Sequence, residues 1–107
     1  MRYEIVLAPR AARQLRDVSA RVGAEVRDAI EVHLRHEPTR ISRSRIKRLR
    51  GLSQPQFRLR VGEVRVFYDV TKEAVEVLAI VTKEQAQAWL DSEGVSTEEG
   101  GPGGGQG

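Results

Sequence analysis

The segment FRLRVGEVRVFYDV, residues 57–70, constrains the fold more than any other part of the chain. Apolar and polar residues alternate on both sides of Gly62-Glu63, and such alternation is typical of two strands that bury one face. A two-residue loop that begins with glycine favours a tight β-hairpin. The chain must therefore build a sheet around this hairpin and cover one of its faces.

The turn also fixes which residues of the hairpin lie opposite each other. With Gly62 and Glu63 as the loop, Val61 faces Val64, and every further pair follows from the two-residue period of a strand. One face then carries Phe57, Leu59, Val61, Val64, Val66 and Tyr68, and the other carries Arg58, Arg60, Arg65 and Phe67. We expect the apolar face to pack on helices, with the hydroxyl of Tyr68 bonded inside the core, and the arginine face to stay open.

In this register Arg60 lies directly opposite Arg65. Like charges in that position destabilise a sheet by roughly 0.2–1 kcal/mol, and a bound anion would remove that cost. Arginine holds phosphate through paired hydrogen bonds, and the ring of Phe67 could stack on a base. Three alternatives stay open: a solvated face, pairing with carboxylates such as Asp69 or Glu76, and a register shifted by one residue.

The rest of the sequence predicts helices before the hairpin and a strand and a helix after it. Pro9 suits the first turn of a helix, and Pro38 ends a second helix. Thr82 and Gln85 have the spacing of a capping box at the start of the last helix. The expected elements are a strand at 3–8, helices from 9 and over 21–36, a strand at 46–49, a turn at 51–56, the hairpin, a strand at 75–81 and a helix at 83–93.

This order, βααββββα, predicts the α+β class. We expect two N-terminal helices packed on a mainly antiparallel, twisted sheet of four to five strands, with a short C-terminal helix. Residues 1–93 form the one expected domain. The remaining segment, 94–107, reads GVSTEEGGPGGGQG, and because it is Gly-rich and acidic we expect it to be a disordered tail.

Positive charge gathers in the middle of the chain, although the formal net charge is only +3. Residues 40–65 contain nine basic residues and one acid, Glu63, whereas the residues after Arg65 contain eight acids and two lysines. The basic loop before the hairpin is either a plain charged surface or an extension of the arginine face into a positive groove. In the second case we expect Lys47, Arg48 and Arg50 to contact the phosphates of a nucleic acid.

Composition excludes several other classes of protein. The chain has no cysteine, so disulfides and thiolate metal sites are excluded. No apolar run is long enough to span a membrane, and the N-terminus is too short and polar for a signal peptide. We expect a cytoplasmic protein without cofactor or metal, in which His33 and His36 line a surface or groove.

The combination IKRLRGL…QFRLRVGEVRVFYDV…VEVLAIVTK resembles the RelE/ParE superfamily of bacterial type II toxins. The superfamily motif is matched by Leu49, Gly51, Phe57, Arg58, Arg60, Gly62, Arg65 and Tyr68. The opening segment YEIVLAPRAARQL is similar to the first strand and helix of the family, so the resemblance covers about residues 2–90.

The resemblance implies a growth-inhibiting toxin with one of two targets. RelE-like members are endoribonucleases, mRNA interferases that cleave mRNA on the ribosome, whereas ParE-like members inhibit DNA gyrase without nuclease activity. Members of both branches are neutralised by a cognate antitoxin. The expected partners are therefore an antitoxin together with mRNA and the ribosome, or alternatively DNA gyrase. A third possibility is a catalytically degenerate homologue that only binds its antitoxin.

The resemblance also implies roles for single residues. Arg58 and Arg60 match catalytic or phosphate-binding cations of the family, and Arg65 matches a phosphate-contacting arginine. RelE-like members place an arginine, and six residues later a tyrosine, near the C-terminus. Here Lys83 and Trp89 hold these positions. We expect Lys83 to be a catalytic cation and Trp89 to stack on RNA, unless Trp89 simply packs the last helix on the sheet.

The residues do not identify the general base of a cleavage reaction. The indole of Trp89 donates a hydrogen bond but cannot accept a proton. Lys83, Glu63 and Glu84 remain as candidates.

Overall fold

The computed structural model describes residues 1–97, so positions 98–107 of the expected tail lie outside the described residues. A five-stranded sheet in the order β1-β6-β5-β4-β2 forms its centre. Strand β1 pairs with β6 in parallel, and the other neighbours are antiparallel. The main elements are β1 Glu4–Leu7, α1 Pro9–Asp17, α2 Ala20–Leu34, β2 Ile46–Arg48, β4 Phe57–Val61, β5 Val64–Val70, β6 Ala74–Thr82 and α3 Lys83–Glu93.

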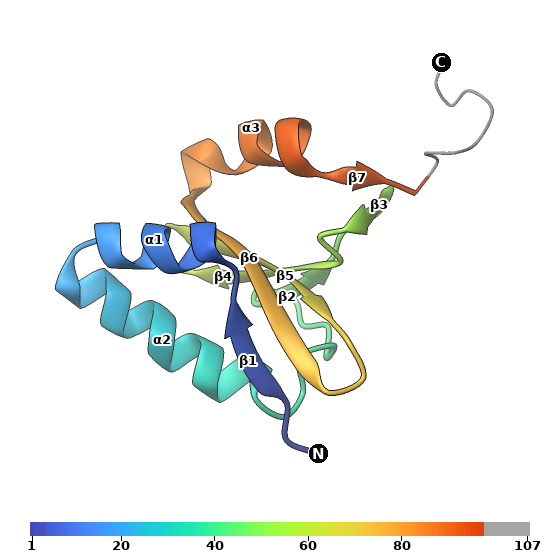
Figure 1. Ribbon diagram of the computed structural model, residues 1–107, viewed down its shortest axis with the longest axis horizontal. Helices are drawn as coiled ribbons and strands as arrows, with labels where there is room; N and C mark the ends of the chain where they lie inside the picture. Colours follow the sequence, from blue (N-terminus) through green and yellow to red (C-terminus); the bar gives the residue numbers. More distant parts are fainter. Residues whose placement is uncertain (98–107) are drawn as a thin grey trace.

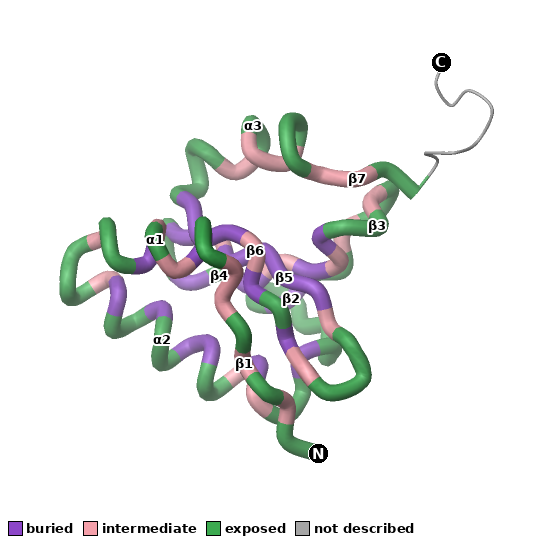
Figure 2. The backbone as a smooth tube through the Cα atoms, in the orientation of Figure 1, coloured by how far each residue is buried: buried purple, intermediate pink, exposed green. Residues whose placement is uncertain are grey.

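The helices cover the two faces of the sheet unequally (Figure 1). Helices α1 and α2 pack on one face and bury the main core. Helix α3 lies over the other face, where a small second cluster forms, and has no fully buried residue. Figure 2 shows the same contrast, because the central strands are buried while α3 is exposed or intermediate along its length. The predicted α+β class with this helix arrangement is confirmed.

The hairpin has the predicted register throughout. Val61 pairs with Val64, Arg60 with Arg65 and Arg58 with Phe67. Gly62 takes a φ of 58°, as the first position of a tight two-residue turn requires and as glycine adopts without strain. The alternative of a register shifted by one residue is therefore wrong.

The apolar face of the hairpin lies in the main core. Tyr68 is buried there, and its hydroxyl donates a 2.7 Å hydrogen bond to the carbonyl of Pro38. The ring stacks on Phe57 with centroids 5.5 Å apart. The expected structural role of Tyr68, with a bonded hydroxyl, is confirmed.

Local signals fix where the helices begin. Ser19 accepts a hydrogen bond from the backbone N–H of Val22 at the start of α2. The predicted capping box at α3 is present, because Thr82 and Gln85 bond each other's backbone N–H groups. No helix within residues 1–97 is both long and apolar enough to cross a bilayer.

Two short strands depart from the expected elements. The expected turn at 51–56 contains strand β3 (Leu52–Gln54), which pairs with strand β7 (Val95–Ser96) from the segment assigned to the tail. Strand structure therefore continues past residue 93, where the sequence predicts the end of the domain. Three-residue and two-residue strands carry too little alternation to be recognised in a sequence.

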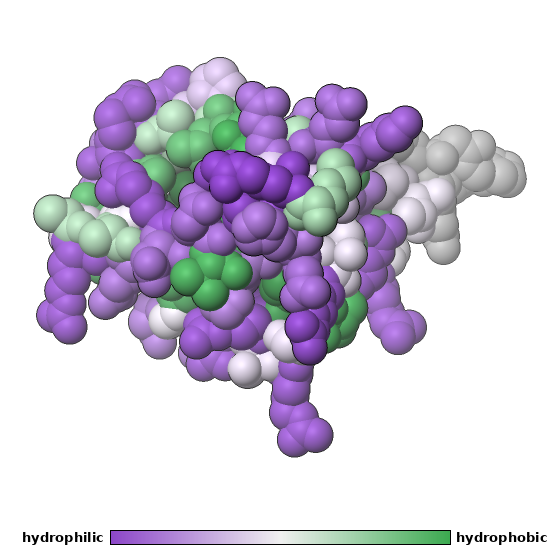
Figure 3. All heavy atoms as spheres, turned by 90° about the horizontal axis from the view of Figure 1, so that it is seen from below, coloured by the Kyte–Doolittle hydropathy of each residue, from purple (hydrophilic) through white to green (hydrophobic). Residues whose placement is uncertain are grey.

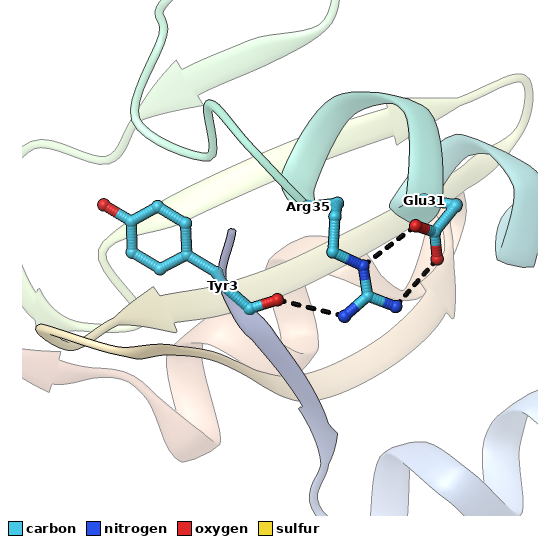
Figure 4. Close-up of polar contacts among 3 residues, drawn as sticks. All are labelled: Tyr3, Glu31 and Arg35. Carbon is cyan, nitrogen blue, oxygen red and sulfur yellow. Dashed lines mark hydrogen bonds and ion pairs between the residues drawn. The ribbon is translucent and has the colours of Figure 1, made fainter. Parts of the chain in front are cut away.

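The end of α2 is fixed to the start of β1 by Arg35 (Figure 4). Its guanidinium donates to both carboxylate oxygens of Glu31 at 2.8 Å and to the carbonyl of Tyr3 at 3.0 Å. Arg35 thus has both a counterion and a backbone acceptor.

Seen from below, most of the surface is hydrophilic and apolar side chains show only in small separate areas (Figure 3).

Candidate nucleic-acid interface

The second face of the sheet presents its cations in two cross-strand rows. Partner side chains in a sheet project from the same face, so the pairing Lys47–Arg58–Phe67 aligns one row across β2, β4 and β5. Arg60 and Arg65 form the second row, next to the hairpin turn. We refer to Lys47, Arg58, Arg60 and Arg65 as the cationic face.

Arg58, Arg60 and Arg65 have no carboxylate partner within the described chain. The four ion pairs of residues 1–97 involve Arg10, Arg21, Arg35 and Arg40. Asp69, one of the two alternative partners, is buried and accepts instead from the side-chain amide of Gln54 at 2.9 Å and the backbone N–H of Gln56 at 2.8 Å. Glu76 takes part in none of these pairs. The alternative of internal neutralisation is therefore wrong for residues 1–97.

Arg58 shows the electrostatic environment of this face. It is partly buried, and its Nε–H is buried without a hydrogen-bond partner among the described residues. Burial lowers the pKa of its guanidinium, and the nearby charges of Arg65 and Arg60 lower that pKa further. Because arginine stays protonated in proteins, the lowered pKa means that its charge is held in an unfavourable place. An anion at this position would remove that penalty.

Arg65 and Lys83 lie near the turn of the hairpin. The Nη1 of Arg65 donates to the carbonyls of Gly62 at 2.9 Å and Val64 at 3.2 Å. These two bonds hold the side chain beside the turn and leave its other donors available. The backbone N–H of Lys83 donates to the carbonyl of Glu63 at 2.7 Å. The start of α3 is thereby attached to the same turn, and Lys83 is placed next to the cationic face.

Phe67 is not the open platform that the sequence suggested. Its side chain is 1% exposed, and Trp89 of α3 stacks on it with centroids 5.2 Å apart and planes within 5°. The expectation of a free Phe67 ring for base stacking is wrong for this structure, because α3 covers that part of the sheet. Trp89 packs the last helix on the sheet, as one of the two readings of this residue predicted. Its indole N–H is buried and lacks an acceptor among the described residues.

The three basic residues before the hairpin do not share one surface. Lys47 and Arg50 line a cavity of 410 Å³ between β2 and α3, together with Leu49, Leu52, Gln87, Leu90 and Asp91. Arg48 projects from the opposite face, because it pairs with Phe57, and its guanidinium lies 5.1 Å from the centre of that ring. Arg48 therefore does not belong to the cationic face, contrary to expectation. Alternation within β2 is the reason, because Arg48 lies on the same face as the buried Ile46 and opposite to Lys47.

Sequence reasoning also missed a cation at this edge of the sheet. Arg45 precedes β2, and its carbonyl accepts from the backbone N–H of Arg60 at 2.9 Å. Its guanidinium reaches back to the carbonyl of Arg60 at 3.4 Å. The two-residue period that includes Lys47 was the available signal, since it continues to Arg45.

Few groups near the cationic face could accept a proton in a reaction. Burial raises the pKa of the Tyr68 hydroxyl, and that hydroxyl already donates to Pro38, so it cannot serve as a base. Glu63 and Glu84 are exposed, at the hairpin turn and in the first turn of α3. Within residues 1–97, no three His, Asp or Glu side chains gather as a metal site would require.

Comparisons with known proteins show which solved structures share this fold. No protein-family model matches the chain, and neither does any curated protein sequence. Among solved structures, a chain of the toxin–antitoxin complex RelBE2 from Mycobacterium tuberculosis matches with 25% identity and a TM-score of 0.61, over 77% of this chain and 99% of that one. A chain of the RelB-RelE antitoxin–toxin complex from Methanococcus jannaschii matches with 16% identity and a TM-score of 0.60, over 78% and 96% of the two chains.

A third match is YoeB from Staphylococcus aureus, a dimer, with 13% identity and a TM-score of 0.55 over 76% of this chain and 97% of that one. The matched chains are thus covered almost completely. This chain therefore shares its fold with chains of two toxin–antitoxin complexes and with YoeB. The resemblance to the RelE/ParE superfamily that the sequence motif indicated is confirmed.

Proposed function

We propose that this chain is the toxin of a type II toxin–antitoxin module and that it acts as an mRNA interferase, cleaving mRNA on the ribosome. The observation that carries the proposal is the cationic face, on which three arginines lie together without a counterion among residues 1–97. Such a face suits a polyanion, and guanidinium groups match the geometry of phosphate oxygens.

The reaction would use the 2′-hydroxyl of the RNA as nucleophile. Its oxygen forms a bond to the adjacent phosphorus while the bond from phosphorus to the 5′-oxygen breaks. The proton of the 2′-hydroxyl passes to water or to an exposed carboxylate, Glu63 or Glu84, and another proton reaches the 5′-oxygen. Arg58 and Arg60 are proposed to stabilise the charge that develops on the non-bridging oxygens, and Arg65 to hold a neighbouring phosphate. Lys83, at the start of α3, is proposed to bind or protonate the leaving oxygen.

One observation favours a second candidate function. The tyrosine hydroxyl of RelE-like sequences is replaced here by Trp89, which stacks on Phe67, and Tyr68 is buried. A face with strong phosphate-binding groups and no evident base fits a protein that binds without cutting. Inhibition of DNA gyrase, as in the ParE branch, is the corresponding alternative.

A cognate antitoxin is the proposed protein partner. The support is that the solved structures with this fold include complexes of a toxin with its antitoxin. An antitoxin that neutralises the cationic face would need an acidic segment, and we expect that segment to fold when it binds.

Cleavage of ribosome-bound mRNA tests the proposed function. Purified chain is added to programmed ribosomes, the cut sites are mapped by primer extension, and DNA supercoiling by gyrase is assayed in parallel. We expect cuts in the mRNA, about 100-fold slower with Arg58→Gln, since one lost donor to a developing oxyanion costs that much. Arg13→Gln, on the exposed side of α1, is the matched control and should cleave normally. Intact mRNA together with inhibited supercoiling would replace the interferase proposal by the gyrase alternative.

A further inference from the structure

A second basic cavity lies at the β2 edge of the molecule, and none of the four residues of the cationic face lines it. It has a volume of 330 Å³ and is formed by the last turn of α2, the following loop and the start of β2. Its lining residues are Val32, His33, His36, Glu37, Arg40, Ser42, Arg45 and Ile46. Four of the eight residues can carry a positive charge: His33, His36, Arg40 and Arg45. None of these four has a part in the proposed cleavage reaction.

The charges of this cavity do not cancel. Its carboxylate, Glu37, is paired with Arg40 at 3.0 Å. Arg45 takes part in no ion pair within residues 1–97, and its guanidinium makes only a long hydrogen bond there, 3.4 Å, to the carbonyl of Arg60. One full positive charge and two histidines therefore remain for a ligand.

The polar groups of the cavity are arranged as donors. Ser42 accepts the backbone N–H groups of Arg45 and Ile46 at 3.0 and 3.1 Å, so its hydroxyl hydrogen is left to donate outward. The Nδ1–H of His36 donates to the carbonyl of Met1 at 3.2 Å, so its Nε2 can donate to an anion only when the ring carries a second proton. The ring nitrogens of His33 have no hydrogen-bond partner among residues 1–97. Donors from two elements thus surround one space.

We propose that this cavity is a second anion site that binds a phosphate group through Arg45, His33, His36 and the hydroxyl of Ser42. Two sources share this chemistry: a free phosphate and a backbone phosphate of RNA that passes around the β2 edge. The contact of Arg45 with the carbonyl of Arg60 joins the cavity to the cationic face. The phosphate site stands independently of the cleavage reaction.

Binding at this site depends on pH through His33. Burial lowers the pKa of its imidazole, the charge of Arg45 lowers that pKa further, and Asp28 on the same helix raises it. The other titratable or charged groups at the cavity are His36 and the Arg40–Glu37 pair. A phosphate next to His33 would favour the protonated ring, and by linkage the protonated protein binds the anion more tightly.

The chain contains only two histidines, so proton NMR resolves the site directly. The pKa of each imidazole is measured in chloride buffer and again with saturating sulfate, a phosphate analogue whose charge is constant over the titration. We expect the pKa of His33 to rise in sulfate. A tenfold preference of the anion for the protonated ring would raise it by about one unit.

Two variants make the result specific to the cavity. Arg45→Ala should weaken sulfate binding about tenfold, because it removes a charge-assisted donor. Arg43→Ala is the matched control: Arg43 is exposed on the same loop and does not line the cavity, and its removal should leave sulfate binding unchanged.

A second arm replaces sulfate by hexauridylate, a short RNA. A rise of the His33 pKa with both probes supports a site for backbone phosphate, and a rise with sulfate alone supports a site for free phosphate. The proposal is overturned if the pKa of His33 does not respond to either probe, or if it responds equally in the Arg45→Ala protein. These results are independent of RNA cleavage, so failure here leaves the proposed function untouched.

Discussion

The two faces of the central sheet differ in whether their buried polar groups have hydrogen-bond partners. On the face covered by α1 and α2, apolar side chains fill the core and the buried hydroxyl of Tyr68 is bonded to Pro38. On the face covered in part by α3, three arginines lack carboxylates, and the buried N–H groups of Arg58 and Trp89 lack acceptors within residues 1–97. One face is organised for stability, and the other retains unsatisfied donors at a cost.

Arg35 and Arg58 illustrate this difference between the two faces. Arg35 is held by both oxygens of Glu31 and by the carbonyl of Tyr3. Arg58 is partly buried beside two further arginines, without any such partner in the described chain. The same side chain is thus a structural link at one site and an unpaired cation at the other. The chain has 18 basic residues and only three are lysines, but the contrast shows that this arginine-rich composition alone does not explain the cationic face.

The largest effect should come from the core side of the hairpin. Leu59→Ala removes a fully buried side chain from β4, and it should cost about 2–5 kcal/mol of unfolding free energy in urea. Arg60→Thr, the next residue on the opposite face, is the matched comparison. It should stabilise the fold by roughly 0.2–1 kcal/mol, since it ends the repulsion with Arg65. A loss of several kcal/mol from Arg60→Thr would contradict the division between the two faces.

Tyr68→Phe should have the next largest effect. The change leaves the buried carbonyl of Pro38 without its donor, at a cost of about 1–3 kcal/mol. The measurement is again the free energy of unfolding, and RNA binding to the cationic face should not change. An unaltered stability would mean that the hydroxyl makes no net contribution to the core.

The contact between α3 and the sheet should be weaker. Trp89→Ala removes the stack on Phe67, which contributes about 0.5–1.5 kcal/mol beyond burial of area. Trp89→Phe keeps an aromatic ring and removes the unpaired N–H, so it should cost much less than Trp89→Ala. Hydrogen exchange of the α3 amides measures both changes, and equal losses in the two variants would show that stacking is unimportant there.

The smallest effect concerns pH. Because the pKa of His33 is lowered in the folded state, the unfolded chain takes up a proton more readily at that position. The contribution of His33 to stability is therefore complete above the unfolded pKa of about 6.5 and is lost as pH falls from there to the folded pKa. His33→Gln should flatten the decline of stability on acidification, measured by urea unfolding from neutral to mildly acidic pH. An identical decline in both proteins would contradict this assignment.

The parts of the molecule that the sequence predicts are those where a local rule applies. The register of the hairpin follows from Gly62 and a strict alternation, and the start of α3 follows from the box formed by Thr82 and Gln85. The rest depends on contacts between distant segments. Strand β3 pairs with β7 some forty residues later, and Trp89 covers Phe67 from another element.

In the candidate site, too, some residues could be placed from a local rule and others depend on contacts between distant segments. That Arg58, Arg60 and Arg65 share a face could be predicted, because all three belong to one hairpin. That Arg48 lies on the opposite face from Lys47 follows from alternation within β2, whereas the contact of Arg45 with the carbonyl of Arg60 depends on how β2 aligns with β4. Alternation sets the faces within a strand but not the pairing between strands that are joined by a loop.

The salt dependence of RNA binding tests the central claim most directly. Affinity for a 2′-O-methyl oligonucleotide, which lacks the attacking hydroxyl, is measured over a range of salt concentrations for the wild type and for Arg58→Gln, Arg60→Gln and Arg65→Gln. If each guanidinium meets a phosphate, each change weakens binding and reduces the slope of log K against log salt by about 0.7, while Arg13→Gln changes neither. Slopes and affinities equal to those of the wild type in all three variants would contradict the claim that this face binds a polyanion.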